Sequence, residues 1–320
     1  MIERSTIRFE HELLRGVELP CIEATGLSDG PHLSLIAGIH GGEYSSIAAV
    51  IRFMRSLDPS ALRGRITAVP VISMPSFQAR TAFVVPQDGK NLNRCFPGDP
   101  DGTFSDVLAH AVFERLIAPA DALLDLHGGD VFESLEPFAL YDESAVEDRA
   151  SELAISFGLP FVVRSRAADA PIEGTTSAAA AAAGVPAVIA EAGGRGLLEE
   201  EAVRLLTDGV SDALRRLDML PGEPRPPRED MRTVGRFVWL RSTSEGWWEP
   251  AVRVGEEVAE SALLGAVKNL YGDIVEEIRS PGDGVPLFIT SSPAVAADGL
   301  LLGLGTDLAS LSSDGVAREQ

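Results

Sequence analysis

The first two thirds of the chain alternate between continuous apolar runs and segments in which apolar residues have helical spacing. Continuous runs predict buried strands, and they cover residues 32–40, 64–74, 121–129, 160–165 and 187–194. Apolar residues that recur every three or four positions predict helices over 44–58, 104–119, 143–158, 175–186 and 197–217. Ser105 is the predicted cap of the second helix. Strands that alternate with helices indicate an α/β sheet.

A change of composition at residues 221–230 predicts a linker. Four of these ten residues, PGEPRPPRED, are prolines. Short apolar runs with regularly placed glycines follow, and they predict a small all-β domain over 231–320, after an α/β domain over 1–220. The later pattern VxxGExV, LLGxV, IRSPGDGVPL resembles the sandwich of lipoyl and biotinyl carrier domains. Lys268 is the only lysine in this segment and lacks the carrier motif, so we expect a structural β module.

The charge balance excludes some classes of partner. Asp and Glu number 48 against 27 Lys and Arg, a net charge of −21, which argues against binding to nucleic acid or to anionic membranes. A few basic residues in a pocket can still hold a small anion. No apolar run is long enough to cross a membrane, and the charged start of the chain does not resemble a secretory signal. With two cysteines, Cys21 and Cys95, we expect a reduced, cytoplasmic protein. The sequence is compatible with a homo-oligomer and does not specify the number of subunits.

Four polar residues at the ends of predicted strands form a candidate site. His40, Glu43, His127 and Glu191 follow strands that run into glycine-rich turns. In open α/β sheets, ligands bind outside the carboxyl ends of the strands. We therefore expect these side chains to face one region of the molecule.

Residue types in this group suit a metal ion. A catalytic zinc site has three ligands drawn from His, Glu and Asp, with one position open for water. His40 and Glu43, in AGIHGGEYSSI, are three positions apart and can converge, although a chain this acidic also produces such pairs by chance. His127 is the candidate third ligand, with Asp130 as a competitor and a hydrogen-bonded core histidine as the alternative. The remaining histidines, His11, His32 and His110, lie in contexts that do not suggest ligands.

A long loop over 78–103 supplies candidate substrate contacts. Loops of this length in compact domains are usually functional. Asn93 and Arg94 in GKNLNRCFPG could hold a substrate carboxylate, because Arg offers a bidentate fork and Asn adds a donor. Arg80 could stabilise an oxyanion. Glu191 could act as general base and then general acid beside a metal. The structural alternatives are a solvated loop with turn-forming residues and, for Glu191, a helix-capping or salt-bridged glutamate.

Four motifs in order resemble one family. His-x-x-Glu, Asn-x-Asn-Arg, Asp-Leu-His and Glu-Ala-Gly-Gly are similar to those of the succinylglutamate desuccinylase/aspartoacylase family, over about residues 30–195. The family has the zinc carboxypeptidase-like fold, so the resemblance implies a mixed sheet flanked by helices, followed by a small barrel-sandwich-like β domain. It implies one zinc per chain. The residue roles that it implies are zinc ligands (His40, Glu43, His127), general base (Glu191), carbonyl-polarising arginine (Arg80) and carboxylate binding (Asn93, Arg94).

One position departs from the family's pattern. Many zinc carboxypeptidase-like enzymes have an aspartate two residues before this asparagine, directed at a ligand histidine, whereas this chain has Asn91. An amide can still accept a hydrogen bond from His40, but it raises the basicity of the ligand less than a carboxylate does.

The resemblance implies a zinc amidohydrolase that cleaves an N-acyl amino acid, or a related small amide, into a carboxylate and a free amine. The segment ARTAFVVPQDGKNLNRCFPG, in the long loop, is more similar to the family's deacetylases of N-acetyl-diaminobutyrate than to its other subgroups. Two other functions are kept open. One is a zinc carboxypeptidase that acts on short peptides, and the other is a non-enzymatic metal-binding protein with a decayed site.

Overall fold

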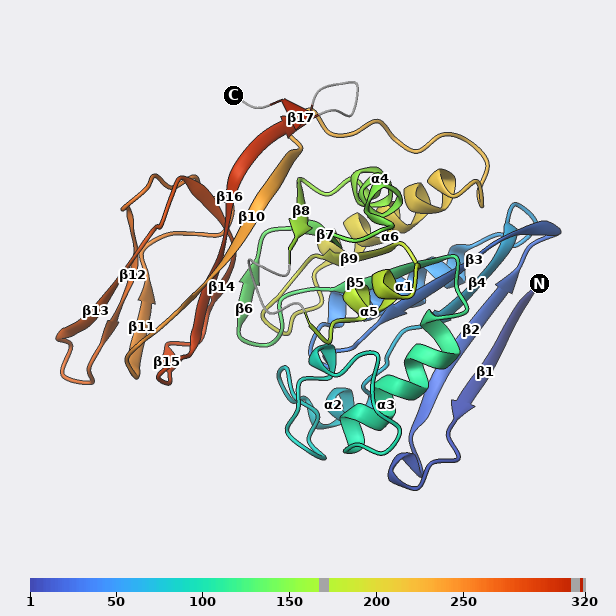
Figure 1. The fold of residues 1–320 in the computed structure, drawn as a ribbon, viewed down its shortest axis with the longest axis horizontal. Coiled ribbons are helices and arrows are strands. Elements are labelled where there is room, and N and C mark those ends of the chain that lie inside the picture. Colours follow the sequence, from blue (N-terminus) through green and yellow to red (C-terminus); the bar gives the residue numbers. More distant parts are fainter. Residues whose placement is uncertain (167–172, 312–316, 319–320) are drawn as a thin grey trace.

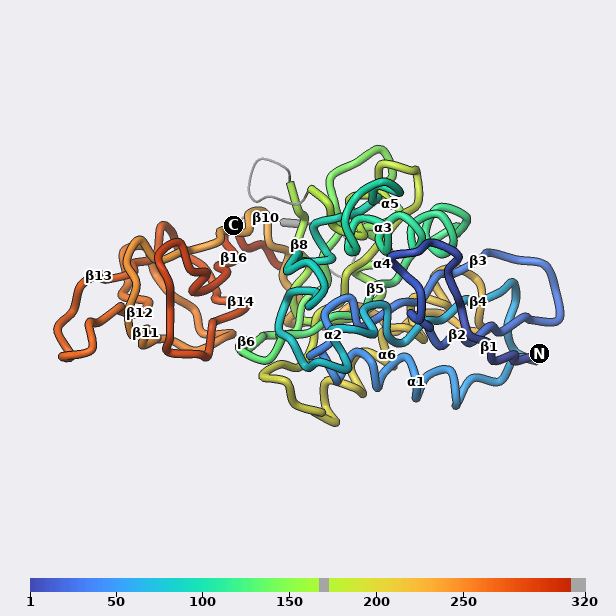
Figure 2. Tube along the Cα trace, turned by 90° about the horizontal axis from the view of Figure 1, so that it is seen from below, coloured from blue at the N-terminus to red at the C-terminus, as the bar shows by residue number. Residues whose placement is uncertain are grey.

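A large mixed sheet with helices on both faces forms the centre of the molecule (Figure 1). The computed structural model describes residues 1–166, 173–311 and 317–318. A second sheet of 4 antiparallel strands lies at one end, and the N-terminal strands lie at the other end of an elongated molecule (Figure 2). The predicted fold class, an α/β mixed sheet followed by a small β unit, is confirmed.

Among the described residues, the large sheet contains 13 strands. In spatial order they are β1 (Ile2–Arg8), β2 (Glu18–Thr25), β4 (Arg63–Val69), β3 (Ser28–Ala37), β5 (Ala122–His127), β9 (Ala187–Glu191), β7 (Phe138–Asp142), β8 (Phe161–Ser165), β10 (Arg232–Arg241), β16 (Leu300–Leu311), β14 (Gly284–Thr290) and β6 (Glu133–Leu135), with β17 (Ala317–Arg318) paired to β16. The small sheet contains β13 (Ile274–Arg279), β12 (Leu263–Lys268), β11 (Gly246–Pro250) and β15 (Ala294–Val295).

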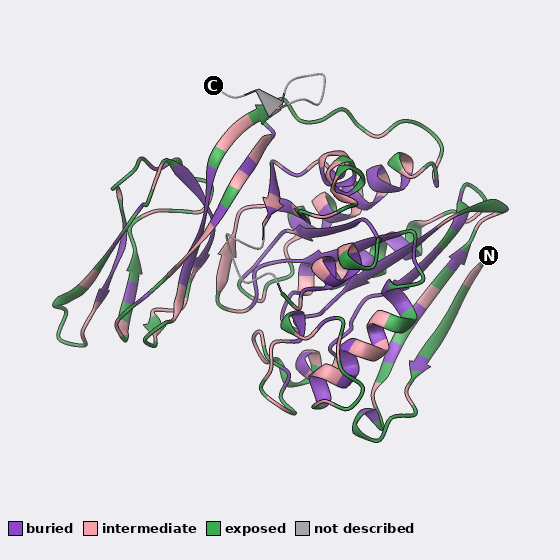
Figure 3. Ribbon diagram, viewed as in Figure 1, coloured by how far each residue is buried: buried purple, intermediate pink, exposed green. Residues whose placement is uncertain are grey.

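Helices cover both faces of the parallel centre of the sheet. They are α1 (Tyr44–Ser56), α2 (Met74–Ala79), α3 (Phe104–Val112), α4 (Glu147–Phe157), α5 (Thr176–Ala182) and α6 (Glu200–Arg216), with short 3-10 turns η1 (Glu12–Leu14) and η2 (Leu92–Arg94) and a π turn η3 (Phe113–Ile117). One face packs against α1, α4 and α6, and the other packs against α3 and α5. Every residue of β5 is buried as a result, which explains its unbroken apolar run (Figure 3).

Several local expectations need correction. The cap of α3 is Thr103, not Ser105, because Thr103 and Asp106 form a reciprocal capping box. Ser105 lies inside the helix, where its hydroxyl donates to Asp88 at 2.7 Å. The sequence pattern also did not indicate strands β1, β2, β6 and β7 or helix α2, all of which are short or half exposed.

The sheet continues across the predicted boundary between the two units. Residues 221–230 form neither helix nor strand, and the chain then enters β10, which pairs in parallel with β8. Strand β14 pairs with β6, a strand from the first unit. The division at 221–230 stays a prediction, and residues 312–316 and 319–320 of the predicted β domain lie outside the described residues. Lys268 forms an ion pair with Glu249 across β11 and β12.

Two expectations from composition agree with the described residues. Cys21 and Cys95 are both free. Within residues 1–166, 173–311 and 317–318, no helix is long and apolar enough to span a bilayer.

Candidate functional site

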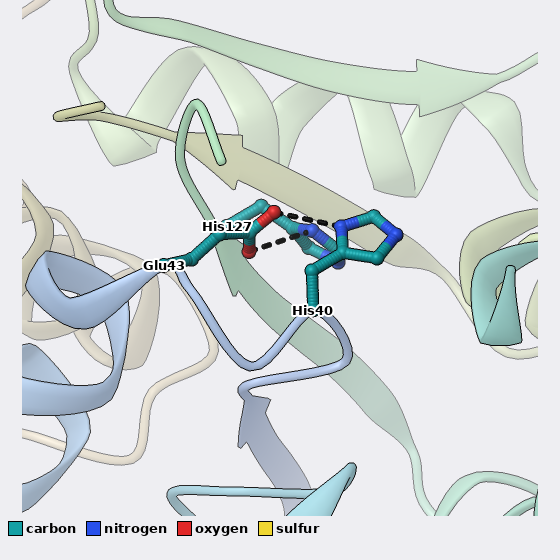
Figure 4. A group of neighbouring side chains, drawn as sticks. All are labelled: His40, Glu43 and His127. Carbon is teal, nitrogen blue, oxygen red and sulfur yellow. Dashed lines mark hydrogen bonds and ion pairs between the residues drawn. The ribbon is translucent and has the colours of Figure 1, made fainter. Parts of the chain in front are cut away.

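The three predicted ligands, His40, Glu43 and His127, meet at the carboxyl edge of the central strands (Figure 4). His40 and Glu43 lie in the turn between β3 and α1, and His127 is the last residue of β5. Strands β3 and β5 are parallel neighbours, with Ala37 opposite Leu126. Ligand atoms of the three residues all lie within 4.8 Å of one another.

Glycines allow the β3–α1 turn to form at this place. A Cβ on Gly41 would lie 2.1 Å from the backbone nitrogen of Phe77 in α2, and one on Gly42 would lie 2.1 Å from Asp130 Oδ1. Neither position has room for a side chain. The two glycines after His40 therefore let the turn pack against α2 and the β5–β6 loop, which brings Glu43 back towards His40.

Both imidazole rings direct the same nitrogen to the centre of the group. His40 Nδ1 lies 2.7 Å from Glu43 Oε1, and His127 Nδ1 lies 3.1 Å from Glu43 Oε2. The outer nitrogens have acceptors: His40 Nε2 is 3.0 Å from Asn91 Oδ1, and His127 Nε2 is 3.0 Å from Asp125 Oδ2. We assign the ring protons to Nε2, which leaves the Nδ1 lone pairs available to a cation.

The charges around this group fit a bound cation. Burial lowers the pKa of His127, but Asp125 and Glu43 outweigh burial and raise that pKa well above its usual value. The pKa of His40 is raised as well, since Glu43 outweighs the effect of burial. Both carboxylate oxygens of Glu43 are directed at the inward nitrogens of the two rings. Two imidazole nitrogens and one carboxylate around one point are a donor set that a metal ion would satisfy.

Two residues behind the ligands orient them. Asn91 accepts from His40, so the contact expected of this amide is present. Asp125 is fully buried, contacts His127 and also accepts from Thr176 Oγ1 at 2.5 Å. Asp125 was not predicted, although the signal was available: residues i and i+2 of a strand share a face, so an acid two positions before a ligand histidine can reach its ring.

Glu191 lies next to the ligand group. It ends β9 and is the register partner of His127 on β5. Burial raises the pKa of Glu191 to about 8, with Glu43 and Glu133 adding to the effect and His127 opposing it. Its Oε2 atom is buried and accepts no hydrogen bond. An unpaired carboxyl group in this position can take up and release a proton.

The loop residues predicted to contact substrate divide into two groups. Asn93 and Arg94 line the same cavity as the ligands, and Asn93 is held by a 3.0 Å hydrogen bond from the backbone nitrogen of Thr176. Arg80 is exposed at the end of α2, with φ of 56°, and does not line this cavity.

Asp130, the competing ligand candidate, accepts from the backbone nitrogens of Phe83 and Val131, both at 2.6 Å, and is outside the three-residue group.

A cavity of about 680 Å³ contains the ligand group. One wall comes from strands after the linker, where the side chains of Phe237, Trp239 and Phe288 contact one another with ring centroids 5.2–6.0 Å apart. Arg241 lines this wall as well and lies close enough to Arg94 to lower its pKa, after the larger effect of burial. A second hollow of about 760 Å³ over β10, β14 and β16 contains none of the predicted site residues.

The chain is an α/β protein with an appended β sheet, and its buried His40, Glu43 and His127 could hold a metal ion. Residues 29–217 match the family model "Succinylglutamate desuccinylase/Aspartoacylase catalytic domain", and the chain belongs to this family. The assignment predicted from four short motifs is therefore confirmed.

Individual relatives cover between 80% and 96% of the chain. The N-alpha-acetyl-L-2,4-diaminobutyric acid deacetylase of Halomonas elongata is 32% identical over 269 residues, which is 80% of this chain and 77% of the relative. The product-bound structure of the ectoine utilization protein EutE (DoeB) from Ruegeria pomeroyi has a TM-score of 0.84 at 25% identity and covers 95% of each chain. A succinylglutamate desuccinylase/aspartoacylase structure from Rhodobacter sphaeroides has a TM-score of 0.81 at 26% identity and covers 96% of this chain and 95% of its own.

Proposed function

We propose that the protein is a zinc-dependent amidohydrolase that cleaves an N-acyl amino acid, or a related small amide, into a carboxylate and a free amine. One observation carries the proposal. The inward nitrogens of His40 and His127 and the carboxylate of Glu43 converge beside the unpaired carboxyl group of Glu191, and one cavity contains all four residues.

The donor set supports zinc as the metal, one ion per chain. Two imidazoles and one carboxylate are a common ligand set of catalytic zinc sites. When bound, the ion would act as a Lewis acid and lower the pKa of a water molecule towards about 7. Asp125 and Asn91 would keep both ligand rings in the required orientation.

The remaining roles belong to residues around the cavity. Glu191 takes a proton from the attacking water and later gives it to the leaving amine when the C–N bond breaks. Asn93 and Arg94 hold the free carboxylate of the substrate. Arg80 is the proposed carbonyl-polarising residue. Since its side chain lies outside the cavity, this role requires the loop after α2 to move when substrate binds.

Family membership and the shape of the cavity support the proposed substrate class. The Halomonas elongata relative is a deacetylase of an N-acetylated amino acid, which supports the same class here. The aromatic wall from β10 and β14 limits the space in front of the ligands, which favours small substrates over long peptides. Short peptides remain the second candidate, because a zinc carboxypeptidase would use the same ligands. The cytoplasmic location stays a prediction.

Metal content and turnover test the proposal together. Purified protein should contain about one zinc per chain, and His127→Ala should lose most of it. A screen should compare N-acetyl, N-succinyl and N-formyl amino acids with dipeptides, before and after a chelator, with zinc added back. Hydrolysis of N-acyl amino acids that zinc restores is the expected result. Turnover of dipeptides alone would favour the carboxypeptidase, and zinc binding without any turnover would favour the non-enzymatic alternative.

A further inference from the structure

Two arginines from segments far apart in the sequence line the cavity of the candidate site. Arg94 ends η2 in the long loop, and Arg241 is the last residue of β10, after the linker. They share one cavity because β10 joins the large sheet through its parallel pairing with β8. Arg241 is exposed to solvent as well as facing the cavity, so it lies at the cavity mouth.

Neither arginine has an acidic partner among the described residues. Arg94 Nη1 donates to the backbone oxygen of Asn93 at 2.7 Å. Arg241 Nη1 donates to the backbone oxygen of Asp298 at 2.8 Å. A carbonyl oxygen carries no net charge, so both guanidinium charges remain uncompensated. Arginines in other parts of the chain form ion pairs with Asp or Glu, for example Arg52, Arg164, Arg204, Arg225 and Arg279.

The two positive charges act on each other. Arg94 is surrounded by protein, and this burial lowers the pKa of its guanidinium, which Arg241 lowers further. The side chain of Arg94 nevertheless remains accessible, because it faces the cavity. Like charges repel, and an anion placed between them replaces the repulsion by two attractions. The net charge of −21 on the whole chain disfavours an anionic ligand, and a local pair of cations offsets that effect.

Packing fixes the position of Arg241 independently of its charge. Phe237, Trp239 and Arg241 are alternate residues of β10, so their side chains share the face towards the cavity. Gly303 is the register partner of Trp239 on β16, and a Cβ there would lie 2.2 Å from Cε1 of Phe288. The glycine thus leaves the rings room to pack against one another. This aromatic wall holds the strand in place, so replacing the arginine at its end should leave the fold intact.

Arg241 keeps donors for a ligand. The contact with Asp298 uses only Nη1, and a guanidinium has five N–H groups. Asn93 and Arg94, the proposed contacts of the substrate carboxylate, line the same cavity. A carboxylate has about four acceptor sites, so it can take a bidentate pair from one arginine and further hydrogen bonds from a second.

We propose that Arg241 binds the free carboxylate of the substrate together with Arg94, so that a strand after the linker completes the carboxylate site. This inference rests on the proposed function, because it places the amino acid part of an N-acyl amino acid in this cavity. Arg241 touches the substrate away from the bond that breaks and takes no part in proton transfer. Its effect is therefore expected in KM rather than in kcat.

A substitution that removes the positive charge provides the test. Arg241→Gln keeps a long polar side chain. Each N-acetyl amino acid that the screen shows to be hydrolysed should be compared with its carboxamide, which has a similar shape and no charge. The wild type should have the higher kcat/KM for the free carboxylates, and Arg241→Gln should reduce this preference about tenfold, the lower end for a charge-assisted hydrogen bond. An unchanged preference, or equal losses on both kinds of substrate, would overturn the proposal.

Two matched variants separate this contact from the general charge of the protein. Arg236→Gln removes an arginine of the same strand that lines the second hollow, so the preference should persist. Arg241→Lys keeps a positive charge at the mouth but loses the planar fork, so it should retain part of the preference. Added salt should lower the wild-type kcat/KM for free carboxylates, and should lower it less in Arg241→Gln. An equal loss of preference in Arg236→Gln would contradict a specific contact.

A binding measurement separates this inference from the proposed function. Calorimetry should measure the binding of norvaline and norvalinamide to the zinc-loaded wild type and to Arg241→Gln. Norvaline should bind more tightly than its amide, and the difference should shrink about tenfold in the variant. If norvaline binds no better than norvalinamide, or if the difference is the same in both proteins, the inference fails even when N-acyl amino acids are hydrolysed. If the difference depends on Arg241 but no amide is hydrolysed, the proposed function fails and the carboxylate site stands.

Discussion

The ring of His127 is held from behind by Asp125: Nε2 lies 3.0 Å from a carboxylate oxygen on the same strand, and that carboxylate is fully buried. The contact leaves Nδ1 directed at Glu43. Asp125→Ala should weaken zinc binding about 10- to 100-fold, because the ring loses its orientation and basicity. Competition with a chelator of known affinity measures the effect. Unchanged zinc affinity in a folded variant would show that Asp125 does not position the ligand.

At His40, the residue behind the ring is the neutral Asn91, so a substitution can add a negative charge there instead of removing one. Oδ1 of Asn91 accepts from both His40 Nε2 and the backbone nitrogen of Asn93, at 3.0 and 2.9 Å. Asn91→Asp preserves both acceptors and adds a negative charge, so zinc should bind about tenfold more tightly. Asn91→Ala is the control and should weaken binding. Equal affinities in the three proteins would mean that this amide does not affect the basicity of His40.

Glu191→Gln separates metal binding from turnover. The amide keeps the volume of the side chain but cannot accept a proton, so turnover should fall by about 10²- to 10⁴-fold while zinc content stays near one per chain. Zinc analysis and kcat should be measured on the same preparation. Near-normal activity in this variant would require another general base.

Arg80 and Arg94 should respond differently to truncation. Arg94 lines the cavity, so Arg94→Ala should raise KM for N-acyl amino acids, with a loss of about 10- to 100-fold in kcat/KM. Arg80 is exposed and outside the cavity, so its proposed oxyanion role requires the loop to move. Arg80→Ala should then lower kcat about 10²- to 10³-fold with little effect on KM, and an unchanged kcat would overturn this role.

Asp142→Asn should stabilise the folded protein near neutral pH. Burial raises the pKa of Asp142, so the folded state binds this proton more tightly than the unfolded chain does. The contribution of Asp142 to stability is therefore full below the unfolded pKa of about 3.9 and is lost as pH rises through the raised folded pKa. The advantage of Asp142→Asn should grow with pH, up to about 1–3 kcal/mol. Unfolding temperatures of both proteins between pH 4.5 and 8 measure this, and a difference that does not depend on pH would contradict it.

The residues that meet at the candidate site could be predicted from the sequence because their signals are local. His40 and Glu43 are three residues apart in a turn, and His127 and Glu191 end apolar strands. In an α/β sheet, parallel strands bring such ends to one edge whatever the rest of the chain does. The four-motif resemblance then identified the family, and the amide contact expected of Asn91 follows from the same local order.

Pairing between distant segments decided the remaining features. The aromatic wall with Arg241 depends on β10 pairing with β8 and on β14 pairing with β6, more than 60 residues apart in each case, and no spacing within the sequence indicates those registers. Whether Arg80 faces the cavity depends on the left-handed turn that ends α2. Asp142 is an ordinary acid in the sequence, and only the fold shows that it is buried and lines the cavity. Residue type and local spacing thus determined which residues converge at the candidate metal site, because parallel strands bring their ends to one edge, whereas tertiary packing determined the walls of the cavity around them.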